Sequence, residues 1–326
     1  MKNFLKINKK EAADFYNKAL FKTFFHSPEW QEFLEKEFKW LKFEHYLYRD
    51  ELLFIFARVG AKLISLPFCE YGGPLPLKSN ANLEEFSKDA LEEFKNIKIK
   101  FHPKIRIGGQ DSGIRTHWIE NPNVLDVEKL FVSFRKTLRH SIRDAEKQHL
   151  DVKICSEKSE LKQFYNLYTA NLKRKKTVPY PFSVIDFLYR NPASELILAL
   201  HKGKVISGCL FLHYQKFIHY FLSANDFKYR NLGANYLILW EKIKKSLPTG
   251  RQALGDYEIF DLGAAPRNSA LEIFKLGWRG KEYPILQLGI QRKDESLRSS
   301  KLRNIWSLLP NFVIKKLSPY LIKYRI

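Results

Sequence analysis

Residues 196–290 constrain the fold more than any other part of the chain, because the hydrophobic period changes within them. Three short runs of apolar, β-branched and aromatic residues, at 196–200, 205–214 and 218–223, are separated by tight turns. Such runs and turns predict an antiparallel three-stranded meander. Residues 234–247 then mix apolar and charged side chains at a helical period, which predicts a helix directly after the meander.

The flanking segments extend this order. A strand at 150–155 and a helix at 160–173 are predicted before the meander, and a strand at 258–262, a helix at 268–276 and a strand at 283–290 after the helix. The order fits the acyl-CoA N-acyltransferase (GNAT-like) architecture. In that fold, the loop before the post-meander helix presents backbone N–H groups and a helix N-terminus to a pyrophosphate.

The loop at this position makes Arg230, Gly233 and Asn235 candidates for binding an acyl donor. An acetyl-CoA loop carries glycine or alanine where this chain has Asn235. An asparagine side chain there narrows the space for a pyrophosphate, which lowers the expectation of CoA as donor without excluding it.

A chain of 326 residues is long enough for two domains. We predict a boundary near Val127, a first domain at 1–127, a second at 128–290 and a basic amphipathic tail at 291–326. The fold class expected is α/β (α+β), with a mixed, mostly antiparallel sheet flanked by helices in each domain.

The first domain opens with a helix for which Ser27 is a suitable N-cap and Pro28 a suitable first residue. Residues 46–59 and 62–68 alternate enough to be strands, and 83–94 form an amphipathic pattern typical of a helix.

Between these segments lies a loop rich in glycine and proline that contains Tyr71, Gly72 and Gly73. Two interpretations are open. The loop either crosses between elements or walls a substrate-binding surface, since glycines permit close approach to the backbone.

The net charge of +21 favours polyanionic partners such as RNA, an anionic membrane leaflet or phosphorylated substrates. A generally lysine-rich proteome is the simpler alternative. Residues 128–149 follow a helical pattern that places Arg135, Arg139 and Arg143 in one stripe. This stripe is either a solvated face or a phosphate-binding surface for the donor.

Lys173 and Arg174 begin a run of four cations. Adjacent like charges repel one another without an anionic partner, so this run favours a binding role.

The tail at 291–326 interleaves cations with Trp306, Phe312 and other apolar residues. It either lies at an anionic membrane surface or docks back on the protein.

The three cysteines are far apart in the sequence and form no CxxC motif, so we predict neither a disulfide framework nor a metal site. No apolar run approaches the ~20 residues that span a bilayer, and the N-terminus lacks the apolar region of a signal peptide. These features predict a cytoplasmic protein, with peripheral contact at the inner face of the membrane left open.

Several motifs together resemble the FemABX-like branch of the GNAT superfamily, the peptidoglycan-bridge aminoacyltransferases and their relatives in envelope polysaccharide loci. The motifs, in chain order, are FHSPEW at 25–30, LPFCEYGGP at 66–74, LRHSIRDAE at 138–146, YFLSA at 220–224, YRNLGAN at 229–235, FDLG at 260–263 and FKLGW at 274–278.

The resemblance implies tandem GNAT-like domains that move an acyl or aminoacyl group to an amine of a cell-envelope precursor. It implies no bound cofactor: the donor is aminoacyl-tRNA or, in other relatives, acyl-CoA. Phe274 and Lys275 match a Phe-Lys pair of the aminoacyltransferases, where the lysine stabilises an oxyanion or holds the tRNA end. Lys173 and Arg174 lie where the family has a phosphate-gripping arginine.

Three further residues are candidates from their positions in the predicted second domain. Asp261, at the end of a strand, is a candidate general base for the acceptor amine, or else caps a loop. Tyr220 and Ser223, on the third strand of the meander, are candidates for lining the same substrate site.

Three functions follow. The first is aminoacyl transfer from charged tRNA to an amine of peptidoglycan or a related, possibly lipid-linked, precursor. The second is acyl-CoA-dependent N-acylation of an envelope polysaccharide sugar. The third is a non-catalytic basic protein that binds RNA or a membrane surface, since a fold alone does not establish activity.

Overall fold

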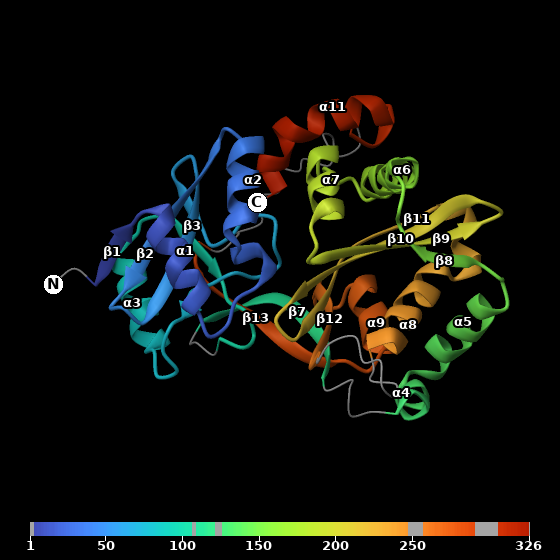
Figure 1. Ribbon diagram of the computed structural model, residues 1–326, viewed down its shortest axis with the longest axis horizontal. Helices are drawn as coiled ribbons and strands as arrows, with labels where there is room; N and C mark the ends of the chain where they lie inside the picture. The colour runs from blue at the N-terminus through green and yellow to red at the C-terminus, as the bar shows by residue number, and fades with distance from the viewer. Residues whose placement is uncertain (1–2, 106–108, 121–125, 247–256, 291–305, 326) are drawn as a thin grey trace. The chain divides into compact units, whose positions relative to one another are not determined.

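The computed structural model describes residues 3–105, 109–120, 126–246, 257–290 and 306–325 (Figure 1). Contacts divide the chain into two compact units. The first comprises 1–116 and 283–295, and the second 117–282 and 296–325. Both units combine strands with helices, which confirms the predicted mixed α/β class. No helix within the described ranges is long and apolar enough to cross a bilayer.

The first unit is built on a mixed sheet. Its strand order is β1 (Phe4–Ile7), β2 (Leu41–Tyr48), β3 (Leu52–Val59), β4 (Lys62–Ile64), β6 (Ile97–Lys100) and β13 (Lys281–Gly289), and β5 (Leu75–Pro76) pairs with β3. Neighbouring strands are antiparallel except for the parallel pair β4–β6.

Successive side chains of each strand point to opposite faces of this sheet, and helices cover both faces. Helix α3 (Leu83–Glu93) packs on the face that carries Phe54 and Phe56. Helices α1 (Lys9–Lys18) and α2 (Pro28–Glu37) contact β2, where His45 bonds to Gln31 of α2 at 2.7 Å. Ser27 caps α2 as predicted, accepting a hydrogen bond from the Trp30 N–H.

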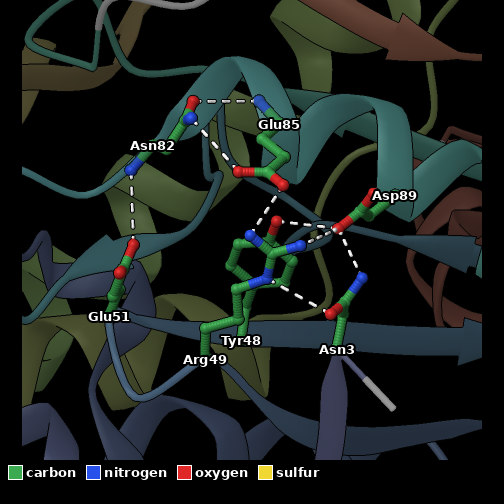
Figure 2. Close-up of polar contacts among 7 residues, drawn as sticks. All are labelled: Asn3, Tyr48, Arg49, Glu51, Asn82, Glu85 and Asp89. Carbon is green, nitrogen blue, oxygen red and sulfur yellow. Dashed lines mark hydrogen bonds and ion pairs between the residues drawn. The ribbon is translucent and has the colours of Figure 1, made fainter. Parts of the chain in front are cut away.

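The strand predicted over 46–59 is wrong in one respect, because a tight turn divides it into β2 and β3. Arg49 and Asp50 form this turn with φ values of +48° and +54°, a conformation that glycine, asparagine and aspartate adopt readily but arginine does not. Figure 2 shows what holds it: the Arg49 guanidinium pairs with Glu85 at 2.7 Å and with Asp89 at 3.2 Å, and also bonds to Asn3. Tertiary ion pairs thus stabilise a turn that Arg49 itself does not favour.

The second unit carries the predicted meander. Its strand order is β7 (Gln110–Glu120), β12 (Ile259–Pro266), β11 (Phe217–Asn225), β10 (Lys204–Tyr214), β9 (Ser194–His201) and β8 (Asp151–Ile154). Strands β9, β10 and β11 pair antiparallel, whereas β11 and β12 are parallel. The meander and the helix after it, α8 (Ala234–Ser246), are confirmed.

Two layers of helices enclose this second sheet (Figure 1). Helices α6 (Lys158–Arg174) and α7 (Phe182–Arg190) pack on one face. Helices α5 (Lys136–Glu146), α8 and α9 (Ala270–Gly277) lie on the other, over a core that includes Phe211, Ile238 and Phe260.

The units do not divide at the predicted boundary near Val127. The division falls between Thr116 and His117, within β7, and the segment from Tyr283 belongs to the first unit. The segment from Tyr283 belongs to the first unit because it lies in β13, which pairs with β6 of that unit.

The single helix predicted over 128–149 is wrong, because it is two helices, α4 (Val127–Ser133) and α5. Phe134 and Arg135 between them have extended ψ values of 155° and 142°. The Phe134 ring packs against Trp278 at 5.2 Å, and the Arg135 N–H donates to the Gly277 carbonyl at 3.0 Å. These tertiary contacts interrupt a pattern that is helical by period.

Residues 291–305 of the tail lie outside the described residues, but the rest of the tail docks on the second unit. Helix α11 (Asn311–Leu321), followed by η4 (Ile322–Arg325), packs against α6. Ile314 and Ser318 are completely buried, and the Ser318 hydroxyl donates to the Pro179 carbonyl at 2.5 Å. Docking, one of the two predicted alternatives, is therefore observed for this part of the chain.

Candidate functional site

The central feature of the second unit is the separation of two parallel strands. β11 and β12 pair over three residues only, and the last pair is His219 with Asp261. Beyond it, Gly263 has φ +78°, and its N–H bonds to the Asp261 carboxylate at 2.8 Å. The register of β11 against β10 also shifts at Phe221, which indicates a β-bulge. The two strands thus separate beyond His219 and Asp261, although each of them continues. Several predicted site residues lie around this point of separation.

On the β11 side, the structure brings Tyr220 and Asn235 together. The Tyr220 hydroxyl donates to Asn235 Oδ1 at 3.3 Å, and the Cys209 thiol donates to the same oxygen at 2.9 Å. Burial raises the pKa of Tyr220 well above its ordinary value, against the lowering effect of its contacts with Ser223 and Asn235. Asn235, in the first turn of α8, therefore uses its side-chain oxygen to fasten that turn to the sheet.

The loop before α8 runs close to α5. Gly233 has φ +65°, and a Cβ there would lie 3.0 Å from the Cβ of Ala145. Both the backbone conformation and the space require glycine at this position. The Gly233 carbonyl accepts the N–H groups of Tyr236 and Leu237, so it begins the helix.

On the β12 side lie Phe274 and Lys275 of α9. Lys275 is only 3% exposed, and its ammonium donates to the Ala264 carbonyl, in the separated part of β12, at 2.8 Å. The Phe274 ring lies 5.4 Å from that of Tyr236 on α8. Lys275 is thus buried, although it lies in the last turn of a helix, where a lysine usually faces solvent.

Asp261 is completely buried at the point of separation. One carboxylate oxygen accepts the Gly263 N–H, and the other lies 3.3 Å from His219 Nδ1, also completely buried. The loop-capping role expected of Asp261 is therefore present. His219 was not predicted from the sequence, because the pattern around a single histidine in an apolar strand is the same as that around any core residue.

Arg174 and Arg230, far apart in sequence, meet over one aromatic ring. Their guanidinium carbons lie 4.4 Å and 4.1 Å from the ring centroid of Phe227, which is 52% exposed. Arg174 ends α6, and Arg230 and Phe227 lie in the 3₁₀ helix η2 (Phe227–Leu232), between β11 and α8. Lys173 precedes Arg174 in the last turn of α6 and is partly buried. Phe227 was not singled out in the sequence, because only the tertiary structure places both arginines on it.

The predicted stripe of Arg135, Arg139 and Arg143 is only partly formed. Arg135 precedes α5 as its N-cap residue, so it does not continue the helical row. Arg139 donates to the Val132 carbonyl at 2.7 Å, and Arg143 lies 5.3 Å from the Phe131 ring. Both side chains thus contact α4.

Tyr71, Gly72 and Gly73 lie in the first unit and are buried. Tyr71 packs edge-on against His102 at 4.4 Å, and the Gly72 N–H donates to the Lys100 carbonyl at 2.9 Å. The Gly73 carbonyl accepts from His26 Nε2 at 3.3 Å. The structure therefore places this loop among core elements.

The first unit also contains a cavity of about 310 Å³. Its lining includes Lys9, Lys10, Tyr16 and His45, from α1 and β2. None of these residues was predicted to belong to a site, because they are distributed between a helix and a strand.

Comparisons with known proteins agree with this geometry. Residues 132–266 match the family model described as an acetyltransferase (GNAT) domain. The chain is similar in structure to FemX, with 13% sequence identity, a TM-score of 0.61, and coverage of 90% of this chain and 98% of that one. No curated protein sequence gave a significant match.

Two further structures are similar. One is the C-terminal domain of a putative lysylphosphatidylglycerol synthetase from Agrobacterium fabrum, at 11% identity and TM-score 0.56, covering 91% of this chain and 97% of that one. The other is a tandem GNAT protein from the clavulanic acid biosynthesis pathway, at 7% identity and TM-score 0.50, covering 88% and 98%.

The matched domain and the shared fold define the class: residues 132–266 match an acetyltransferase (GNAT) domain, which supports an acyltransferase, and the chain shares its fold with FemX and with a tandem GNAT protein. The similarity in fold to FemX agrees with the sequence motifs that resemble the FemABX-like branch. The matched domain includes the separated strands, Tyr220, Arg230 and Asn235, whereas Lys275 lies beyond its end.

Proposed function

We propose that the protein transfers an aminoacyl group from charged tRNA to an amine of a cell-envelope precursor. The observation that carries this proposal is the exposed Phe227 with Arg174 and Arg230 over its ring. Single-stranded RNA is bound by aromatic rings that stack on bases and by guanidinium groups that bind phosphates. The similarity in fold to FemX and to a lysylphosphatidylglycerol synthetase domain supports the same donor class.

In this mechanism the acceptor amine attacks the carbonyl carbon of the aminoacyl ester. The new C–N bond forms and the ester C–O bond breaks. The proton that the amine loses passes to a base and from it to the leaving oxygen, so the tRNA departs with a terminal hydroxyl. Lys275 stabilises the oxyanion of the tetrahedral intermediate, and Asp261, supported by His219, is the candidate base. The separated segments of β11 and β12 bind the acyl group between Tyr220 and Lys275.

The donor is tested by binding of an aminoacyl-tRNA at several salt concentrations. Arg174→Ala and Arg230→Ala are each expected to weaken binding and to lower the slope of log K against log salt by about 0.7, the value for one lost phosphate contact on a single strand. The matched control is Arg190→Ala on α7, whose guanidinium pairs with Asp186 at 2.8 Å. Equal affinities and slopes for all four proteins would refute the assignment.

Acetyl-CoA is the second candidate donor, because the matching family model describes an acetyltransferase. Calorimetric titration with CoA and acetyl-CoA at physiological salt distinguishes the two, since salt suppresses non-specific attraction to a +21 protein. Saturable binding of CoA or acetyl-CoA at micromolar or tighter affinity would make acyl-CoA the donor instead of tRNA, and the product would then be an N-acylated polysaccharide sugar. If neither binds, charged tRNA remains the proposed donor.

The acceptor is proposed to be lipid-linked, because α11 exposes apolar side chains even though it is docked. Phe312 and Tyr320 are 72% and 71% exposed, whereas Ile314 and Ser318 are buried against the protein. An apolar face with neighbouring lysines suits an anionic membrane surface. Phe312→Ser with Tyr320→Ser is expected to reduce co-sedimentation with anionic vesicles, and unchanged co-sedimentation would refute the membrane contact.

A further inference from the structure

His117, on β7, is a completely buried histidine whose surroundings do not satisfy it. Neither ring nitrogen has a hydrogen-bond partner among the residues that the structure describes. Leaving a buried polar group unsatisfied is unfavourable, so an ion or a water molecule bound to either nitrogen would stabilise the ring. Burial lowers the pKa of His117, as does the nearby charge of Lys275, whereas the carboxylates of Glu282, Glu272 and Asp261 raise it. Metal ions bind imidazole in its neutral form.

Two carboxylates lie beside this ring. Glu272 of α9 and Glu282 of β13 each place an oxygen so that these two atoms and a His117 ring nitrogen all lie within 4.8 Å of one another. Glu272 is buried, and Glu282 is exposed, which leaves a path from solvent. The N–H of Asn268 bonds to Glu272 Oε2 at 2.6 Å, and a carboxylate has a second oxygen for another ligand.

The backbone explains why these residues meet. Gly280 passes so close to β7 that a Cβ on it would lie 3.3 Å from backbone atoms of Trp118. Lys281 pairs with Glu120 at 3.5 Å in the same region. The segment that leads to Glu282 therefore runs along β7 beside His117. Its backbone is placed by these contacts and not by the side chains of His117, Glu272 and Glu282.

We propose that His117, Glu272 and Glu282 form a binding site for a divalent transition-metal ion, with Zn²⁺ as the best match. One imidazole and two carboxylates are ligands that Zn²⁺ accepts, at about 2.0–2.2 Å each, so two ligand atoms on a tetrahedral ion lie about 3.3–3.6 Å apart. The three atoms lie within 4.8 Å of one another, so binding must bring the widest pair closer by up to about 1.5 Å through rotation of side chains.

The charges of this site also suit a dication. Two carboxylates neutralise the ion, and they outweigh the opposing charge of Lys275, one turn along α9 from Glu272. Three protein ligands leave a fourth coordination position open. The site goes beyond the proposed function and does not depend on the identity of the acyl donor.

The test is titration of chelator-treated protein with Zn²⁺ and with Co²⁺. One ion per chain is expected at micromolar or tighter affinity, with visible Co²⁺ absorption and a Zn²⁺-dependent rise in Tm. His117→Ala and Glu282→Gln are expected to weaken binding at least about 100-fold, above the 10–100-fold typical of a lost outer contact. Because Glu282 is exposed, its variant remains informative if His117→Ala fails to fold.

His140→Ala is the matched control, since His140 forms an exposed pair with Asp144 at 3.1 Å and belongs to no three-ligand group among the described residues. It is expected to bind Zn²⁺ like the wild type. The proposal would be overturned if the wild type bound Zn²⁺ no more tightly than the Glu282→Gln variant. It would also be overturned if His140→Ala weakened Zn²⁺ binding as much as Glu282→Gln does.

Discussion

Replacement of Lys275 by methionine separates a catalytic lysine from one that only holds the fold together. Lys275 is only 3% exposed, and its ammonium donates to the Ala264 carbonyl at 2.8 Å. Removing the donor removes this charged hydrogen bond, which costs about 1.5–3 kcal/mol of stability. If Lys275 also stabilises the oxyanion, kcat falls by about 100- to 1,000-fold, equivalent to about 3–4 kcal/mol of activation free energy.

Two measurements are needed on the same protein. Urea unfolding gives the loss of stability, and single-turnover transfer to a model amine, with the aminoacyl-tRNA saturating, gives the rate of the chemical step. Lys245→Met, an exposed lysine at the end of α8, controls for the loss of one positive charge. A folded Lys275→Met protein that retains more than about a third of the wild-type rate would refute the role of Lys275, because one lost transition-state donor costs at least about 100-fold.

Two further predictions concern stability. Ile314→Ala is expected to lower the free energy of unfolding by about 2–4 kcal/mol, because Ile314 is fully buried, whereas Phe312→Ala, at a residue 72% exposed, is expected to change it by less than about 0.5 kcal/mol. Equal effects in urea unfolding would contradict the docking of α11. The hydrogen bond from Arg58 lowers the pKa of Glu44 to about 2, against the opposing effect of burial. This carboxylate therefore stabilises the fold above pH 4.5, and its contribution is lost as the pH falls from 4.5 towards 2. Glu44→Gln should flatten that part of the profile of unfolding free energy against pH, and an unchanged profile would contradict the ion pair.

Two parts of the candidate site were predicted in different ways. The resemblance to the FemABX-like branch pointed to the Phe274–Lys275 pair, and the GNAT-like order of elements pointed to the loop with Arg230 and Gly233. The structure shows the surroundings of each. Gly233 is explained fully, because its positive φ and its contact with Ala145 both require glycine. The burial of Lys275 was not predictable, since a lysine in the last turn of a helix usually faces solvent.

The sequence by itself determined the three-stranded meander of the second unit and the helix after it. Its alternation of apolar residues and its tight turns specify strands, and the change to a helical period specifies α8, because both patterns depend on neighbours along the chain. The motifs that resemble the FemABX-like branch likewise predicted the GNAT fold.

The tertiary structure alone decided what depends on residues distant in sequence. It divided the helix predicted over 128–149, because Phe134 packs against Trp278, and it held the turn at Arg49 through ion pairs with α3. It also placed Arg174 beside Arg230 over Phe227, and His117 beside two glutamates. Such groups of residues cannot be predicted from sequence spacing, because their members come from segments that are far apart along the chain.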